Sequence, residues 1–129
     1  MGPINWLAVP VSAALAMAVA FVWYGPLFGA ARTRDVQDSR AASVLGGALL
    51  QALSAAMLAH NFARIGAATL AVKPWLYWMQ SGGIAVAFII PALWISYARR
   101  RLPRREALID SGFWLVTYLA TGTVFWALS

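Results

Sequence analysis

Cysteine is absent from this sequence, histidine occurs once, and only four of the 129 residues are acidic. Without cysteine, the chain has no disulfide framework, no thiolate metal ligand and no thiol nucleophile. Charged residues make up 11% of the chain, against about 25% in a soluble domain. Because 62% of the residues are hydrophobic and the mean hydropathy is +0.71, the composition excludes an ordinary soluble enzyme and a disordered segment.

Long apolar stretches alternate with short charged ones, and each apolar stretch is near or above the roughly 20 residues that cross a bilayer as a helix. Residues 1–5 contain no Lys or Arg, which disfavours a cleaved signal peptide as the alternative for the first stretch. The sequence predicts one all-α transmembrane domain over residues 1–129. We expect an integral membrane bundle of four transmembrane helices at about 4–24, 41–62, 74–97 and 107–128.

The net charge of +6 would suggest nucleic-acid binding in a soluble protein, but here the basic residues follow the loops. Two of the ten, Arg64 and Lys73, lie in the second loop. The other eight lie in the first and third loops: Arg32, Arg34, Arg40, Arg99, Arg100, Arg101, Arg104 and Arg105. Short basic loops stay on the cytoplasmic side, so we expect both chain termini outside and no nucleic-acid partner.

The five arginines between residues 99 and 105 are candidate ligands for anionic lipid headgroups at the cytoplasmic surface. Aromatic residues near the predicted helix ends agree with the four spans, since amphipathic rings favour the membrane interfaces. The predicted outer belt is Trp6, Trp75, Trp78 and Trp126, and the predicted inner belt is Trp23, Tyr24, Trp94, Tyr97 and Trp114.

Small residues at four-residue spacing predict faces where helix backbones approach closely, although alanine is also simply common in this chain. The stripes are Ser12, Ala16 and Ala20 on the first helix, Ala48, Ala52 and Ala56 on the second, and Gly83 and Ala87 on the third. Pro10 and Pro91 fall within predicted helices and are expected to kink them.

The fourth predicted helix carries a bulky face containing Trp114, Tyr118 and Phe125. This face is a candidate surface for a partner protein, a lipid tail or a polyisoprenoid, and ordinary packing in the bundle core is the alternative.

Candidates for chemistry are few. The chain contains no hydrolase, Walker-type, zinc-protease or dinucleotide-binding motif, so we expect no catalytic residue, no metal site and no bound cofactor. No acid or base falls near the middle of a predicted span, which disfavours a cation-coupled multidrug pump. The remaining polar candidates are Gln51, Ser54, His60, Gln80 and Asp110.

Each polar candidate has a structural alternative. Gln51 and Ser54 share a helix face and can form a hydrogen bond between helices. His60 ends the second span, either as a proton-sensitive or ligand-binding site or as a cation at the negative end of the helix dipole. For Asp110 we expect an Arg–Asp pair at headgroup level, and a conduction or coupling role is the alternative.

Four sequence elements resemble a bacterial family of small four-helix membrane proteins catalogued as a domain of unknown function. The elements are Asn5-Trp6-Leu7-Ala8-Val9, the turn Trp23-Tyr24-Gly25-Pro26-Leu27-Phe28-Gly29, Leu58-Ala59-His60, and Gly112-Phe113-Trp114-Leu115-Val116. The resemblance implies an integral protein of the bacterial inner membrane and transfers no activity. In the turn, we expect Pro26 to end the first helix.

These observations favour a non-enzymatic accessory subunit that packs through helix faces into a homo-oligomeric or hetero-oligomeric membrane complex and contacts lipid or a hydrophobic cofactor. The alternative is a small transporter or channel that works as a homo-oligomer, because four helices leave little room for a pathway in one copy. A membrane enzyme is the third hypothesis, and His60, Glu106 and Asp110 are the only residues that could serve it.

Overall fold

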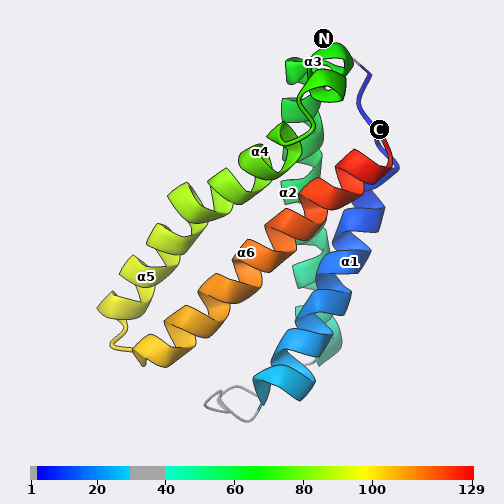
Figure 1. Cartoon of the computed structure of the whole chain (residues 1–129). Coiled ribbons are helices and arrows are strands. Elements are labelled where there is room, and N and C mark those ends of the chain that lie inside the picture. Colours follow the sequence, from blue (N-terminus) through cyan, green and yellow to red (C-terminus); the bar gives the residue numbers. More distant parts are fainter. Residues whose placement is uncertain (1–2, 30–39) are drawn as a thin grey trace.

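A computed structural model describes residues 3–29 and 40–129, and the described residues form only helices and short connections (Figure 1). Four helical segments are long and apolar enough to cross a membrane, at Ala8–Leu27, Val44–Ile65, Leu76–Arg99 and Arg104–Ala127. The predicted all-α fold with four transmembrane helices is therefore confirmed, with boundaries shifted by a few residues. Both chain termini lie at one end of the molecule (Figure 1), as an even number of spans requires.

The four spans differ in the helical segments that compose them. Span one is α1 (Ala8–Val22) followed by the π-helical η1 (Trp23–Leu27), and span two is α2 (Arg40–Ile65). The short α3 (Ala67–Val72) connects span two to span three, which consists of α4 (Leu76–Ile84), the π-helical η3 (Ala85–Ile89) and α5 (Ile90–Arg99). Span four is α6 (Arg104–Ala127).

The prolines explain the two π-helical turns. Pro26 lies inside η1, and Phe28 N–H donates to the Trp23 carbonyl at 2.9 Å, five residues back. A wider turn moves the carbonyl that would meet the proline ring, so Pro26 is accommodated in a π-helical turn. The helix ends at Leu27, one residue after Pro26, which agrees with the predicted end within the precision of helix boundaries. In span three, η3 directly precedes the turn that contains Pro91.

Pro10 does not have the predicted effect on the first helix. Because α1 begins at Ala8, Pro10 falls in its first turn. Backbone N–H groups in the first turn have no partner within the helix, so a proline there removes no hydrogen bond. The kink expected at Pro10 was therefore wrong.

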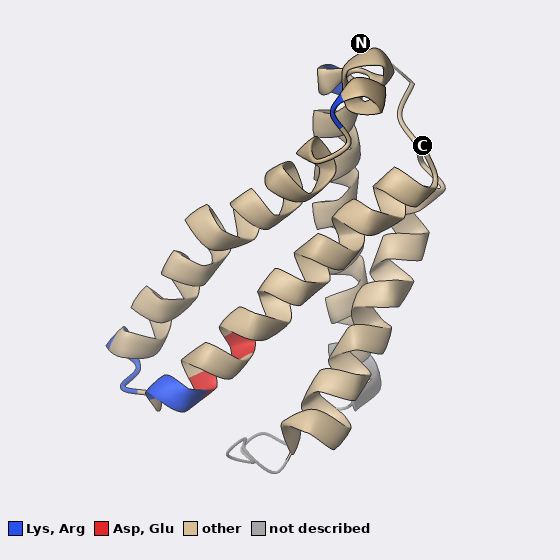
Figure 2. Cartoon of the chain, viewed as in Figure 1, with Lys and Arg blue, Asp and Glu red and all other residues tan. Residues whose placement is uncertain are grey.

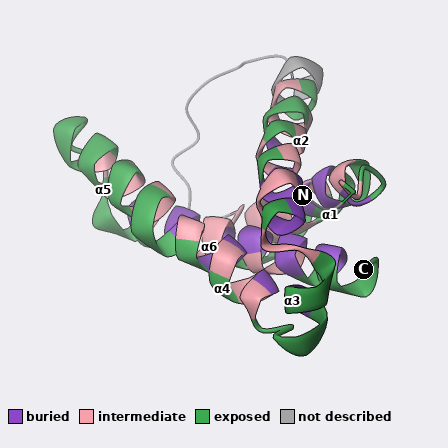
Figure 3. Ribbon diagram, turned by 90° about the horizontal axis from the view of Figure 1, so that it is seen from above, coloured by how far each residue is buried: buried purple, intermediate pink, exposed green. Residues whose placement is uncertain are grey.

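Span four lies at the centre of the arrangement (Figures 1 and 3). It packs against α1 on one side and against α4, η3 and α5 on the other, while α2 packs mainly against α1. In its most apolar stretch 44% of the residues are buried, compared with 22%, 22% and 17% in spans one to three. The third span is therefore the one least covered by the rest of the protein, as the exposed colouring of α5 in Figure 3 shows.

Small residues form the closest helix contacts, but not always those that the spacing predicted. On α1, Ser12 and Ala16 are buried as expected. On α2 the buried positions include Gln51, Ala55 and Ala59, one step around the helix from the predicted alanines. On span three, Gly83 and Ala87 are exposed, and Ser81, Gly82 and Ala85 are buried in their place.

The connection from α5 to α6 places an arginine in a backbone conformation that favours glycine. Leu102 N–H donates to the Tyr97 carbonyl at 3.0 Å and Arg101 N–H to the Ala98 carbonyl at 3.2 Å, which is the hydrogen-bond pattern of a Schellman motif. Arg101 has φ of 54° at the position where glycine is usual. Pro103 then precedes the first residue of α6 and cannot continue α5.

Basic residues lie at both ends of the molecule (Figure 2). Arg99, Arg100, Arg101, Arg104 and Arg105 are all exposed at the end opposite the termini, which we call the arginine end. The end with both termini is called the terminal end. Arg32 and Arg34, on which the predicted sidedness also depends, lie outside the described residues.

The contact between α4 and α6 depends on Gly122. A methyl group there would meet Ser81 Oγ and lie 2.9 Å from the Tyr77 carbonyl oxygen, which belongs to the backbone and cannot rotate away. We expect Gly122→Ala to lower the free energy of unfolding in mixed micelles by about 1–3 kcal/mol. Gly46→Ala is the control, since a methyl group at Gly46 has no neighbour within 4 Å. Equal effects of the two substitutions would contradict the packing described here.

Candidate functional site

The carboxyl group of Asp110 is buried in the second turn of α6 and lies between two tyrosines. Tyr24 OH, from η1, donates to Asp110 Oδ1 at 2.7 Å, and Tyr97 OH, from α5, donates to Asp110 Oδ2. The side chain is 8% exposed. Among the described residues its partners are these two hydroxyl groups and no arginine, so the expected Arg–Asp pair is not present there.

Two tryptophans bind the residues on either side of Asp110. Trp23 Nε1–H donates to the Ile109 carbonyl at 3.0 Å, and Trp94 Nε1–H donates to Ser111 Oγ at 3.0 Å. Span one and span three therefore each supply one indole and one phenol to three consecutive residues of α6. We call this set the Asp110 cluster; it consists of Trp23, Tyr24, Trp94, Tyr97, Ile109, Asp110 and Ser111.

A glycine favours close approach of the Trp23 side chain of η1 to α6 at this level. A methyl group at Gly112 would lie 2.8 Å from Trp23 Cζ2. The Tyr24 ring also packs against Phe113, with 5.0 Å between ring centroids. The Trp-Tyr-Gly-Pro turn and the Gly-Phe-Trp element that carry the family resemblance therefore meet in space at the Asp110 cluster.

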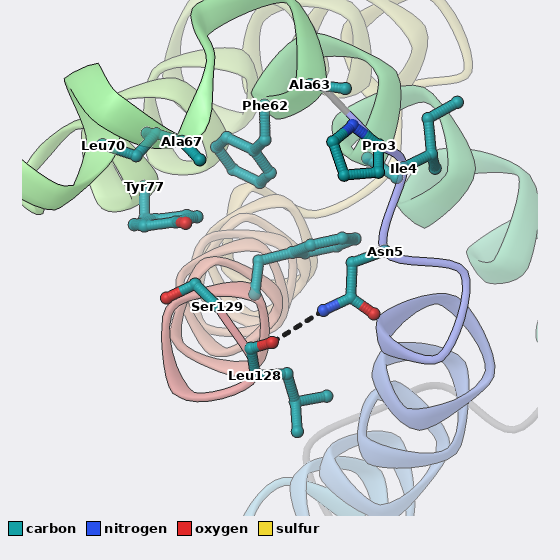
Figure 4. Close-up of a pocket in the computed structure, with 12 residues that line it drawn as sticks. Pro3, Ile4, Asn5, Phe62, Ala63, Ala67, Leu70, Tyr77, Leu128 and Ser129 are labelled. Atoms are coloured by element: carbon teal, nitrogen blue, oxygen red, sulfur yellow. Dashed lines mark hydrogen bonds between the residues drawn. The ribbon is translucent and has the colours of Figure 1, made fainter.

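A cavity of about 380 Å³ lies at the terminal end (Figure 4). Its walls come from the N-terminal segment, the end of α2, α3, the start of α4 and the end of α6. The lining residues are Pro3, Ile4, Asn5, Ala59, Phe62, Ala63, Ala67, Leu70, Tyr77, Phe125, Leu128 and Ser129. We call it the terminal cavity.

Aromatic rings and one interhelical hydrogen bond shape this cavity. The Phe62 ring packs against Tyr77 at 4.8 Å and against Phe125 at 5.1 Å between centroids. Asn5 Nδ2–H donates to the Leu128 carbonyl at 2.8 Å, which joins the N-terminal segment to the end of α6 (Figure 4). Asn5 Oδ1 also accepts from Ala8 N–H at 3.2 Å, so the same side chain caps the start of α1.

The other predicted polar residues lie apart from the Asp110 cluster. His60 is half-buried near the terminal end, with Nδ1 2.9 Å from the Ala56 carbonyl oxygen and its ring edge-on to Trp6 at 5.8 Å. Gln51 is buried, and Ser54 and Gln80 are half-buried. Within the described part of the chain, no side-chain hydrogen bond joins Gln51 or Ser54 to another helix.

The bulky face predicted on the fourth helix lies mainly in the interior. Tyr118 and Phe125 are 7% and 3% exposed and belong to the hydrophobic core, and Trp114 packs against that core from its edge. In one copy of the protein, this face therefore contacts the other spans.

A family described as "Protein of unknown function (DUF1761)" matches residues 7–126. The chain belongs to this family. No curated protein and no solved structure matches it. Family membership therefore agrees with the resemblance found in the sequence and, like it, brings no assigned activity.

Sequence reasoning placed Trp23, Tyr24, Trp94 and Tyr97 in an interfacial belt and missed their bonds to α6. The information was present in part, because Asp110 was expected at the same membrane depth as these aromatic residues. What the sequence did not indicate is that the four side chains point to the same turn of α6 from opposite sides.

The two tyrosine hydroxyls hold spans one and three against α6. We expect Tyr24→Phe and Tyr97→Phe each to lower the free energy of unfolding by about 0.6–2 kcal/mol, the usual value of a hydrogen bond between membrane helices. Tyr118→Phe is the matched control, since the Tyr118 hydroxyl has no hydrogen-bond partner among the described residues. Unfolding titrations in which all three variants behave alike would rule out this role.

Proposed function

We propose that this protein is a non-enzymatic accessory subunit of the bacterial inner membrane, with both termini outside, and that it assembles with a second copy of itself. The observation that carries the proposal is the outer face of the third span. Gly83, Ala87 and Pro91 follow one another at four-residue spacing and are all exposed. A methyl group built on Gly83 has no neighbour within 4 Å.

In a membrane helix, exposed small residues are stronger evidence for an association surface than exposed large residues are. Large apolar side chains pack equally well against lipid tails, so their exposure alone indicates nothing. Gly83 and Ala87 instead leave a shallow surface where the backbone of another helix can approach closely, and Phe88 beside them is 71% exposed. A second copy supplies a matching surface, because symmetric dimers use the same patch on both partners.

The third span has only α6 as an extensive neighbour along η3 and α5. A span packed on one side alone retains most of its lateral surface for association. The exposed residues that define this face, Gly83, Ala87, Phe88 and Pro91, are apolar, so a pore lined by them would have no polar lining. This supports an accessory role over the alternative of a homo-oligomeric transporter or channel.

Anionic lipid is the proposed partner at the arginine end. All five arginines from Arg99 to Arg105 are exposed around the turn between α5 and α6. Arg101 keeps a long charged side chain at φ of 54°, where glycine would be less strained. A headgroup contact would offset this local cost.

Single-cysteine cross-linking tests the proposed interface, and the natural absence of cysteine removes background. We expect Ala87→Cys to give a cross-linked dimer in native membranes with a short thiol-reactive linker. Leu45→Cys, at an exposed position on α2, is the control and should remain mostly monomeric. Gly83→Leu in the Ala87→Cys background should lower the dimer yield several-fold, since the bulky side chain occupies the contact. Equal cross-linking from positions 45 and 87 would overturn the interface.

Replacing Arg101 by glycine separates stability from lipid binding. We expect Arg101→Gly to leave the free energy of unfolding unchanged or to raise it by up to about 1 kcal/mol, since the strained backbone is relieved. Affinity for anionic lipid should fall roughly fivefold, the equivalent of about 1 kcal/mol per arginine. Native mass spectrometry with anionic and neutral lipids measures this, with Arg64→Gly as the control at the other end. Undiminished retention of anionic lipid by Arg101→Gly would contradict the assignment.

A further inference from the structure

We propose that the terminal cavity binds a neutral membrane amphiphile, a molecule with a mainly apolar body and one hydrogen-bonding carbonyl oxygen. The cavity volume of about 380 Å³ lies within the usual range for small-molecule sites. Its walls are built from apolar residues and aromatic rings, which suit an apolar body.

Tyr77 supplies the polar contact. The residue is 5% exposed and lines the cavity, and its ring projects from α4 toward the middle of the cavity (Figure 4). Among the described residues its hydroxyl has no hydrogen-bond partner. The fully buried side-chain atoms without a partner among the described residues are Ser12 Oγ and Thr117 Oγ1, so the Tyr77 hydroxyl oxygen is accessible and can donate a hydrogen bond to a ligand oxygen.

Asn5 is less available to a ligand than Tyr77. Its amide already donates to the Leu128 carbonyl and accepts from Ala8 N–H. This side chain therefore closes the wall between the N-terminal segment and α6, and leaves the Tyr77 hydroxyl as the main donor.

The lining also defines the charge of the ligand. None of the twelve side chains that line the cavity is charged. A charged headgroup would lose its hydration in this cavity without gaining a paired charge, which is strongly unfavourable. The ligand class is therefore neutral.

The position of the cavity agrees with an amphiphile that has one polar end. Trp78 and Trp126 pack together at 5.5 Å beside this end of α4 and α6, and Trp6 lies next to Asn5 in the sequence. Tryptophans gather at the membrane interface, where lipid headgroups and carbonyl groups lie. The site is separate from the proposed dimer interface, because its lining includes none of Gly83, Ala87 and Pro91.

Photolabelling of the full chain in nanodiscs of neutral lipid tests the proposal. The probe is a monoacylglycerol with a diazirine in its acyl chain, and labelled sites are read by peptide mass spectrometry. We expect labels on the cavity residues of α2, α3 and the end of α6, at probe concentrations far below that of the nanodisc lipid. Labelling mainly of lipid-facing positions such as Phe88 would overturn the proposal.

Two adjacent alanines provide the matched variants. Ala67 lines the cavity and Ala68 does not, and both are exposed on α3, so a tryptophan at either position leaves the core unchanged. We expect Ala67→Trp to lower cavity labelling about tenfold and Ala68→Trp to leave it within about twofold, if filling the cavity removes most of the apolar contact. Similar labelling of the two variants would contradict binding in the cavity.

Tyr77→Phe tests the hydrogen bond without altering the shape of the wall. Loss of the Tyr77 hydroxyl should weaken the apparent affinity for the probe about three- to tenfold, which is the equivalent of one hydrogen bond. Unchanged affinity would remove the carbonyl requirement and overturn the proposed ligand class.

Unlabelled competitors distinguish the sources of the carbonyl group. Competition by a short-chain benzoquinone assigns the site to ring carbonyls, and competition by unlabelled monoacylglycerol assigns it to acyl esters; either outcome supports the neutral class. Equal competition by a fatty-acid anion would overturn it. The assay reports on ligand binding alone, so its failure is distinguishable from a failure to dimerise.

Discussion

Hydrogen bonding of three consecutive residues of α6 from two sides holds the spans together at the arginine end. Trp23 and Tyr24 reach Ile109 and Asp110 from span one, and Trp94 and Tyr97 reach Ser111 and Asp110 from span three. In a membrane, an apolar side chain gains little free energy when it moves from lipid into a contact between helices. Directed polar contacts and close packing therefore determine which helices associate. The central position of α6 follows from these contacts.

The same contacts explain why a carboxyl group is tolerated in the second turn of a membrane helix. Asp110 lies near the helix N-terminus, where the helix dipole favours negative charge, and both of its oxygens accept hydrogen bonds. With α1 on one side of α6 and the third span on the other, the third span has only one extensively packed side. Its opposite face is exposed because α6 occupies the centre of the arrangement, and this exposed face underlies the proposed assembly.

At the terminal end, the contacts between helices are mainly aromatic and apolar. One hydrogen bond from Asn5 to Leu128 connects the N-terminal segment to α6, and a cavity remains between them and α3. The protein therefore has a hydrogen-bonded cluster near the arginines and an aromatic-lined cavity near its termini.

The amino-acid sequence by itself determined the number of spans, their approximate limits and the cluster of arginines near Asp110 in the sequence. These features follow from the bilayer, because a chain in hydrocarbon satisfies its backbone only as a helix of sufficient length. Tertiary structure decided which face of each helix is buried: Ser12 and Ala16 pack as predicted, whereas Gly83 and Ala87 are exposed. The physical reason is that lipid and protein interior are both apolar, so hydrophobicity does not distinguish an inward face from an outward one. For the same reason, the convergence of Tyr24 and Tyr97 on Asp110 became visible only once the helices were placed in space.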